Sequence, residues 1–241
     1  MIGRLIYHSK SGKKDMNTNV PAFSDDIRGN GIPLRVVLVE FSNLLIFSKS
    51  DDLDAEFVKA VKETLDGFTL DNLATDKAVR SVRELFRSFG TDPTKWRPSS
   101  EAMIRRILKD KTLFRINSLV DINNIISIRY RLPIGLYDLK KVGGRIRIDI
   151  GREGLSFSGL TGREYNTYGK PVVIDEFGVI GSPIVDSERT KITVETSNVL
   201  AIIFSSKNEP FAHSLNAGKD FANLAVRFHP DCKAESPVLS E

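Results

Sequence analysis

Hydrophobic residues recur with helical spacing in the first half of the chain and with alternating spacing in much of the second half. Apolar positions three and four residues apart share one face of a helix, so the first half is expected to be mainly helical. Helices are predicted after a cap at Asp54, after a cap at Asp76, from Pro98–Ser99 onward, over Asn117–Arg129 and, later, over Asn216–Phe228. The first of them is expected to bury Phe57, Val58, Val61 and Leu65.

Strands are predicted where Val, Ile, Leu and Phe cluster or alternate with polar residues. The clearest alternation runs from Arg145 to Ile150, where two Arg residues and one Asp alternate with three Ile residues. The other strand candidates are Leu5–Tyr7, Leu34–Phe47 (one or two strands), Leu155–Phe157, Val172–Ile174, Ile192–Val194 and Val199–Phe204. Helices first and strands later, without regular alternation, predict the α+β class rather than a doubly wound sheet.

Composition agrees with a folded protein, since 41% of the 241 residues are hydrophobic and 27% are charged. We expect an N-terminal arm, or a short strand plus loop, over residues 1–30 and a single domain over residues 31–241. No apolar run approaches the roughly 18 residues of a membrane span, and no signal-peptide core is seen. Cys232 is the single cysteine, so no internal disulfide can form. These features together predict a cytoplasmic globular protein.

Positive charge is concentrated in the middle of the chain. Residues 99–165 hold 13 Lys and Arg against 7 Asp and Glu, within a chain whose formal net charge is +4. Such a segment is typical of a surface that binds a polyanion, and the open alternative is that the charges are spread over several solvated faces. The RNA-binding candidates are Arg105, Arg106, Lys109, Lys111, Arg129, Arg131, Arg145 and Arg147. Few aromatic residues lie between them, which favours contacts to phosphates over base stacking.

Several kinds of chemistry find no support in the sequence. No His or Cys pair has metal-ligand spacing, so no metal is predicted, and no phosphate-binding glycine loop indicates a nucleotide cofactor. We therefore predict no cofactor. The segment around Ser156 lacks the second glycine of a nucleophile elbow. A Ser-His-Asp triad would have to use His213 or His229.

Two polar segments stand out as candidate binding sites. Asn117, Asp121 and Asn124 share one face of a predicted helix, although short polar side chains are poor helix-interior residues. That face is either a helix cap with solvated neighbours or a buried surface against a loop or pocket.

The second segment runs from Gly181 to Thr196 and contains Asp186, Ser187, Arg189 and Thr190. Arg189 either pairs with Asp186 inside the loop or holds a carboxylate or phosphate. Ser187 and Thr190 offer hydroxyls for a water or a small ligand.

A family resemblance joins these segments. Residues 97–106 (RPSSEAMIRR) and 116–124 (INSLVDINN) resemble the B3/B4 domain of the phenylalanyl-tRNA synthetase beta chain, and more closely the free-standing proteins built on that domain. Matches continue at residues 132–139 (LPIGLYDL), 144–148, 173–175 and 181–196. The resemblance covers roughly residues 36–228. It implies a central, mostly antiparallel or mixed sheet flanked by helices, and a domain that binds the aminoacyl end of tRNA and hydrolyses misacylated tyrosine.

The matched segments add Gly135, Asp138, Gly181 and Ser182 to the pocket candidates. The synthetase pattern has a pocket His where this chain has Gly135, a second Gly where it has Ser182, and a pocket Glu near Ile202. These departures argue against tyrosine-specific editing, because a buried ligand hydroxyl without a partner costs binding energy.

Two hypotheses follow from the resemblance. The first is an editing hydrolase that deacylates misacylated tRNA, with N–H groups of an expected Gly178–Ser182 turn at the ester carbonyl. The second is a module that binds RNA or a small metabolite without chemistry. No catalytic residue is assigned, ligase activity is not expected of this chain alone, and the amino acid, the tRNA and the oligomeric state stay open.

Overall fold

The computed structural model describes residues 20–240 and has the predicted α+β class. The helices in this range are α1 (Asp25–Gly29), α2 (Asp51–Gly67), α3 (Lys77–Ser88), α4 (Ser99–Asp110), α5 (Ser118–Tyr130) and α6 (Phe211–Phe228), with a 3₁₀ turn at Leu73–Thr75. The strands are β1 (Ala22–Phe23), β2 (Leu34–Ser42), β3 (Ile134–Asp138), β4 (Arg147–Ile150), β5 (Ser156–Ser158), β6 (Glu164–Asn166), β7 (Pro171–Asp175), β8 (Gly178–Gly181), β9 (Val199–Ser206), β10 (Lys233–Ala234) and β11 (Val238–Ser240).

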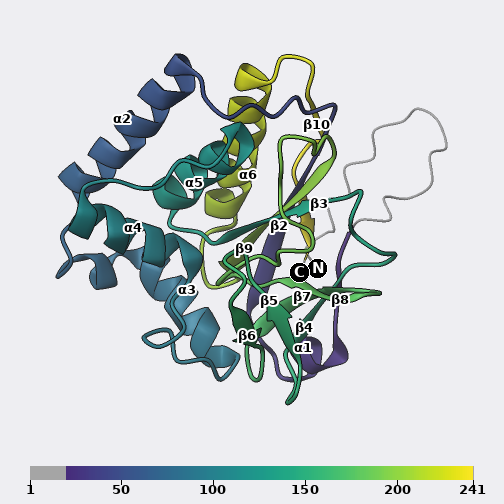
Figure 1. Ribbon diagram of the computed structural model, residues 1–241. Coiled ribbons are helices and arrows are strands. Elements are labelled where there is room, and N and C mark those ends of the chain that lie inside the picture. The colour runs from purple at the N-terminus through teal and green to yellow at the C-terminus, as the bar shows by residue number, and fades with distance from the viewer. Residues whose placement is uncertain (1–19, 241) are drawn as a thin grey trace, which may run out of the picture.

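Two sheets form the centre of the molecule (Figure 1). The larger sheet has the order β10-β2-β9-β3, with β11 also paired to β2, and all of these pairs are antiparallel. The smaller sheet has the order β1-β4-β7-β8, in which only the β1–β4 pair is parallel. Strands β5 and β6 form a separate hairpin.

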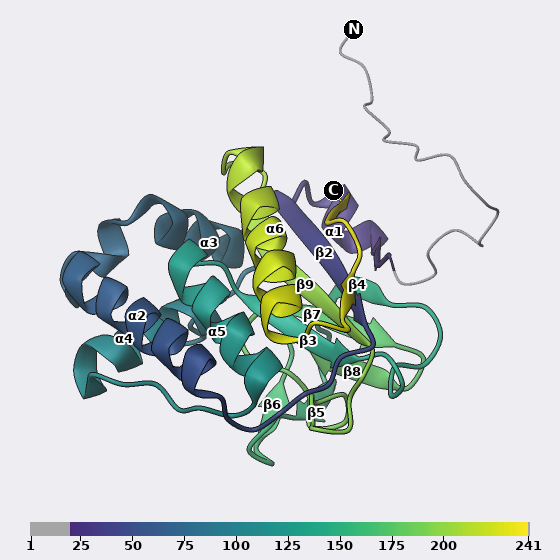
Figure 2. The same cartoon turned by 90° about the horizontal axis from the view of Figure 1, so that it is seen from above.

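The larger sheet is covered on both faces. Helices α2, α4, α5 and α6 gather on one side, and the smaller sheet lies on the other (Figure 2). The centre of β2, residues 36–39, is apolar because both of its faces are covered. Val37 and Val39 pack in the helix-side core, while Val36 and Leu38 pack toward the smaller sheet. β3 is the free edge of this sheet, and this edge borders the candidate site.

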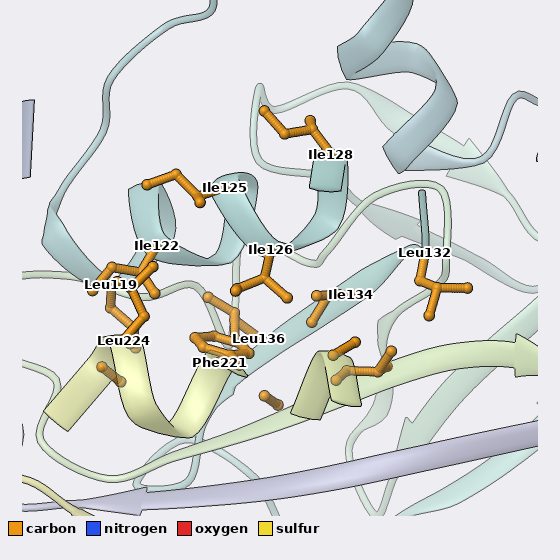
Figure 3. Close-up of a cluster of buried hydrophobic side chains, with 14 of the residues drawn as sticks. Leu119, Ile122, Ile125, Ile126, Ile128, Leu132, Ile134, Leu136, Phe221 and Leu224 are labelled. Atoms are coloured by element: carbon orange, nitrogen blue, oxygen red, sulfur yellow. The ribbon is translucent and has the colours of Figure 1, made fainter. Parts of the chain in front are cut away.

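The helix-side core positions α5 against β3 and α6. Side chains of Ile122 and Ile126 from α5 meet Leu136 of β3 and Phe221 of α6 (Figure 3). Two of the predicted caps hold as well, whereas Asp54 lies inside the first turn of its helix. The Val79 N–H donates to Asp76 Oδ1 at 3.1 Å at the start of α3, and the Val120 N–H donates to Asn117 Oδ1 at 3.1 Å at the start of α5.

Two helices begin earlier than their apolar patterns predicted. α2 begins at Asp51, because the acidic Asp51, Asp52 and Asp54 are all favourable in a first turn next to the helix dipole. Val58 lies off the buried face of α2, because it follows Phe57 directly and is therefore turned about 100° away from it, and it is 64% exposed. α6 begins at Phe211, directly after Pro210, and so includes a first turn that carries little apolar periodicity.

Three expected strand or turn segments differ from the structure. Ile192–Val194 lies in a loop, where the Thr196 N–H donates to the Thr193 carbonyl and the Thr193 N–H donates to Thr196 Oγ1. Such hydroxyl-stabilised turns compete with strand formation. The buried strand that begins at Leu34 ends at Ser42, short of Phe47. The expected turn at Gly178–Ser182 is strand β8 over its first four residues.

Part of the expected N-terminal arm packs onto the domain. β1 pairs with β4, and Ile27 of α1 is buried in the core between the sheets. The expected strand at Leu5–Tyr7 lies outside the described residues, and the division at residue 30 stays a prediction. Between residues 20 and 240, no helix is long and apolar enough to cross a membrane.

Candidate functional site

A cavity of about 350 Å³ lies between α5, the edge strand β3 and the loops that follow β8. Its lining is mostly aliphatic, with several polar groups among the apolar ones. The lining residues are Ser99, Met103, Ile116, Val120, Asn123, Asn124, Ile134, Leu136, Leu160, Ser182, Ile184, Val185, Asp186, Lys191 and Ile192. An apolar recess with a few convergent polar groups is the usual form of a small-ligand site. Asn124, Ser182 and Asp186 are the predicted site residues that reach it.

The segment Ser182–Asp186 forms one wall because it covers the free edge of β3. The Leu136 N–H, which has no strand partner on that side, donates to Asp186 Oδ2 at 3.1 Å. The segment itself is a tight turn, in which the Ser182 N–H donates to the Val185 carbonyl and Ser182 Oγ accepts from the Ile184 and Val185 N–H groups. The Ser99 N–H donates to the Pro183 carbonyl and thereby fixes this wall to the start of α4.

Gly135 and Gly181 make room for two buried polar atoms, the hydroxyl oxygen of Tyr137 and Oδ1 of Asp186, although Asp186 as a residue is partly exposed. A Cβ on Gly135 would lie 2.3 Å from Tyr137 Oη and 3.0 Å from Asp186 Oδ1, and a Cβ on Gly181 would lie 2.9 Å from the same Asp186 oxygen. Both positions therefore require glycine while Tyr137 keeps its place. Gly135, a pocket candidate from the sequence, faces Tyr137 and does not line this cavity.

The environment of this pair alters its acid–base behaviour. Burial raises the pKa of Asp186 to about 7, although the Leu136 N–H and the Tyr137 hydroxyl act in the opposite direction. Burial also raises the pKa of Tyr137 well above its ordinary value, and the neighbouring Asp186 adds to this effect. Within residues 20–240, neither Tyr137 Oη nor Asp186 Oδ1 has a well-aligned hydrogen-bond partner. The two atoms are thus polar groups sealed behind the cavity wall.

The polar face predicted on α5 divides between two roles. Asn117 caps the helix and directs its amide toward the Ile192 carbonyl, 3.5 Å away. Asp121 is fully buried and accepts from the Arg115 guanidinium at 2.7 Å and from the Ile116 N–H at 2.9 Å. These two residues anchor the loops beside the cavity without lining it, whereas Asn124 lines it.

Asn123 is a site residue that the sequence prediction did not select. It is 7% exposed, it lines the cavity, and its Oδ1 is buried without a hydrogen-bond partner among the described residues. A buried amide oxygen on the wall of a recess is suited to a ligand donor, because leaving it unpaired is costly. The signal was present in the sequence as a fourth short polar residue within the same stretch of helix.

Arg189 does not pair with Asp186, and this expectation is corrected. Its guanidinium donates to both oxygens of Asp175, at 2.6 and 3.0 Å, and to the Lys141 carbonyl at 3.0 Å. Asp175 in turn accepts from the N–H groups of Gly143 and Phe177. Burial alone would raise the pKa of Asp175, but these hydrogen bonds outweigh it and lower the pKa. Arg189 therefore holds its loop in place, and its guanidinium is hydrogen-bonded to groups of the protein itself.

The remaining pocket candidates hold the same loops in place. Thr190 Oγ1 donates to the Ile180 carbonyl at 3.2 Å, and Ser187 Oγ accepts from the Arg189 N–H. Asp138 accepts from Thr196 Oγ1 at 2.9 Å and from the Lys140 N–H at 3.0 Å. None of these three side chains lines the cavity. Nor can the Gly178–Ser182 N–H groups act together as a turn that binds an oxyanion, because that segment forms strand β8.

The basic candidates lie on separate elements, and half of them have acidic partners. Arg105 donates to buried Glu101 at 2.7 Å, Arg129 to Glu56 at 2.7 Å, and Arg131 and Arg147 pair with Asp76 and Asp149 at 3.4 and 3.2 Å. Lys111 Nζ donates to the Leu108 carbonyl. Arg106, Lys109 and Arg145 are exposed and have no ion pair within residues 20–240. Of these three, Arg106 and Lys109 belong to α4, whose first residues line the recess.

A Ser–His pair also exists, but it lies inside the core. Ser118 Oγ and His229 Nε2 are 2.8 Å apart, and both residues are almost fully buried. The Phe47 N–H donates to the same hydroxyl, and His229 Nδ1 faces the Ala225 carbonyl at 2.9 Å. This pair joins three segments and has no route to a substrate. Among residues 20–240, no group of three or more His, Cys, Asp or Glu side chains is placed to hold a metal ion.

Comparison with known proteins places this geometry in a family. The family model described as B3/4 domain matches residues 81–215, which is more than half of the chain and includes every residue that lines the cavity. The chain belongs to the B3/4 domain family.

Curated relatives of this B3/4 domain are phenylalanine--tRNA ligase beta subunits. That of Bartonella henselae is 40% identical over 87 residues, which are 35% of this chain and 11% of the relative. That of Wolbachia sp. subsp. Brugia malayi is 32% identical over 100 residues, which are 39% of this chain and 13% of the relative. The matched region is thus a small part of each ligase subunit. An N-terminal fragment of the phenylalanyl-tRNA synthetase beta-subunit from Pyrococcus horikoshii has a TM-score of 0.48 at 15% identity, covering 97% of this chain and 57% of that one.

The strand register of the B3/4 domain brings together two of the three positions at which this sequence departs from the synthetase pattern. Gly135 of β3 is the direct partner of Ile202 on β9, and Ile202 is fully buried. A His and a Glu at these positions would be neighbours on one face of the sheet. In this chain that face is filled by Ile202 and by the side chain of Tyr137.

Proposed function

We propose that this protein binds the aminoacylated 3′ end of a tRNA, receives the amino-acid side chain in the cavity and hydrolyses the ester of misacylated tRNA. Membership of the B3/4 family and the names of its ligase relatives support a tRNA-related role. The single observation that carries the proposal is the cavity itself, an aliphatic recess at the edge of β3 with amide, hydroxyl and ammonium groups on its wall.

The reaction needs little beyond positioning. A water oxygen attacks the ester carbonyl carbon, the bond from that carbon to the ribose oxygen breaks, and the ribose oxygen takes up the proton. An aminoacyl ester is already activated, so binding and orientation supply most of the required assistance. Asn124 and Lys191, whose ammonium also donates to Glu188, are side-chain donors at the cavity that can face the developing negative charge on the carbonyl oxygen.

The exposed cations of α4 supply a path for the RNA. Ser99 and Met103 of this helix line the cavity, and Arg106 and Lys109 continue along it toward solvent. We propose that these two side chains contact the phosphates that precede the terminal adenosine, while Arg105 stays paired with Glu101. No cofactor is required for this reaction.

A second candidate function is binding without hydrolysis. It is favoured by one observation, namely that Gly135 and Ile202 place no ionisable group where the synthetase pattern has a His and a Glu. In this case the domain would hold an aminoacyl-tRNA, or a small metabolite, and leave its bond intact.

A panel of misacylated tRNAs separates the two functions. Purified protein is incubated with tRNAs that carry different radiolabelled amino acids, and the remaining ester is measured over time, with spontaneous deacylation as the blank. Deacylation above the blank for at least one member supports the hydrolase. Tight tRNA binding without deacylation of any member supports the second candidate, and neither activity contradicts both. Val120→Phe, which fills the cavity, is the matched inactive variant, and Val58→Phe on the exposed side of α2 is its control.

A further inference from the structure

The cavity has a closed inner end and an open mouth. Ile134 and Leu136 are almost fully buried at the inner end, whereas Ile116 and Leu160 are 60% and 48% exposed. Asp186 stands at the inner end, where its carboxylate is held by the Leu136 N–H. The space beside Gly135, which Asp186 Oδ1 also borders, is occupied by the hydroxyl of Tyr137. The recess therefore stops at Asp186.

The apolar wall is built from one kind of side chain. Val, Ile, Leu and Met supply all of the apolar lining among the described residues. Such a wall binds an aliphatic side chain through close packing, and a missing or additional methylene changes binding by about ten-fold or more.

The carboxylate at the inner end is already engaged by the protein's own groups, so the hydroxyl of a bound phenol would compete with them for it. Asp186 Oδ2 already accepts from Leu136, and Asp186 Oδ1 faces the protein's own Tyr137 hydroxyl rather than the cavity. The Tyr137 hydroxyl thus stands in the place that a longer, hydroxyl-bearing ligand would need.

The polar groups of the wall suit the α-ammonium and carbonyl groups, which all esterified amino acids share. Asn123 and Asn124 project from adjacent positions of α5, and Asn124 is the more exposed of the two. The buried Asn123 Oδ1 lacks a donor, and the Asn124 side chain makes no hydrogen bond to the rest of residues 20–240. An α-ammonium group and an ester carbonyl provide a donor and an acceptor for these two amides.

We propose that the cavity selects an aliphatic amino-acid side chain and excludes that of tyrosine, with Tyr137 and Asp186 as the residues that set this limit. The inference rests on the proposed function, because it identifies the substrate class of the same site. Asn123 and Asn124 hold the amino acid at its polar end, and Tyr137 acts from behind the wall as a positioning residue.

The test uses non-hydrolysable analogues of the tRNA end, in which valine, leucine or tyrosine is joined by an amide to 3′-amino-3′-deoxyadenosine. Isothermal titration of the full chain measures each dissociation constant. We expect the valyl or the leucyl analogue to bind at least about ten-fold more tightly than the tyrosyl analogue. Equal affinity, or a preference for tyrosine, overturns the inference.

Variants test the cause of the selection. Asp186→Ala removes the end wall and is expected to reduce the preference over tyrosine to less than about three-fold. Folding of each variant is judged by circular dichroism and thermal melting. If Asp186→Ala does not fold, Tyr137→Leu is the second variant, because it frees the space behind the end wall. An unchanged preference in a folded variant counts against these residues as the determinants.

The outcomes also separate this inference from the function on which it rests. If misacylated tRNAs are deacylated and the tyrosyl analogue binds best, the function stands and the inference fails. If no analogue binds and no tRNA is bound or deacylated, the proposed function fails and the inference fails with it. If the protein recognises only amino acids linked to whole tRNA, the deacylation rates of valyl-, leucyl- and tyrosyl-tRNA replace the dissociation constants. Faster deacylation of the valyl or leucyl ester supports the inference, and equal or faster deacylation of the tyrosyl ester overturns it.

Discussion

Arg189 holds Asp175 through two hydrogen bonds, from its two terminal nitrogens to the two carboxylate oxygens, at 2.6 and 3.0 Å. The pair joins the loop after β8 to the turn between β7 and β8, and Asp175 is fully enclosed. Since the planar fork of arginine matches a carboxylate and the ammonium of lysine does not, this contact is specific to arginine.

Arg189→Lys should therefore reduce stability and function together. We expect the free energy of unfolding to fall by about 1–3 kcal/mol, because buried Asp175 loses one of its two charge-assisted hydrogen bonds and keeps only the Gly143 and Phe177 N–H groups beside the remaining one. Urea unfolding followed by circular dichroism, alongside the deacylation or binding assay, measures both effects. Loss of function with unchanged stability would instead assign Arg189 to the ligand.

Gly135→Ala should destabilise the protein because of Tyr137. The new methyl group would lie 2.3 Å from the Tyr137 hydroxyl, and overpacking of this kind costs about 1–3 kcal/mol. Tyr137→Phe in the same chain removes the closest atom and should restore part of the loss, so a double-mutant cycle should show favourable coupling. Gly67→Ala, at a position with no atom within 4 Å of the added group, is the control. Purely additive effects of the two changes would show that the hydroxyl is not the obstacle.

The ionisation of Asp186 predicts a dependence of stability on pH. Its pKa is raised from 3.8 to about 7 in the folded state, so between these values the folded protein binds one more proton at this site than the unfolded chain. This contribution is fully present below pH about 4 and is lost as the pH rises to about 7, at about 1.4 kcal/mol per pH unit.

Asp186→Asn removes the ionisable group, so the difference between the variant and the wild type reports the titration of Asp186. The amide oxygen can still accept from the Leu136 N–H, so the variant and the wild type should have similar stability near pH 4. Near pH 8 the variant should be the more stable of the two. Unfolding free energies from urea titrations at several pH values give the difference, and a difference that does not change with pH would contradict the raised pKa.

Charge reversal on α4 should weaken binding of tRNA. Arg106→Glu with Lys109→Glu is expected to lower affinity and to reduce the slope of log affinity against log salt, which amounts to roughly 0.7–0.9 per phosphate contact. Arg105 is unsuitable for this test, because it holds the buried carboxylate of Glu101. Reversal of Lys49 and Lys62, which are exposed next to and on α2, is the matched control. Equal salt slopes for the two double variants would show that α4 does not contact RNA.

Local patterns in the sequence determined most of the elements and some of their ends. The spacing of Ile122 and Ile126 places one face of α5 in the core, and Asp76 and Asn117 cap the helices that follow them. These features depend on residues within three or four positions of one another, so the local sequence is sufficient to predict them. The motifs of residues 97–139 likewise identified the family, which the match over residues 81–215 confirmed.

The tertiary structure decided which distant groups meet. A charged side chain such as Arg189 has the same local sequence whether Asp186 or Asp175 is its partner, and only the docking of β7 against β8 selects Asp175. Asn123 and Asp121 are two residues apart on α5 and point in different directions, one to the cavity and one to Arg115. Gly135 has no signal of its own, because its need for a missing side chain comes from the hydroxyl of Tyr137 in the folded core. Periodicity specifies the face of an element, whereas the partner of that face depends on contacts between segments that are far apart along the chain.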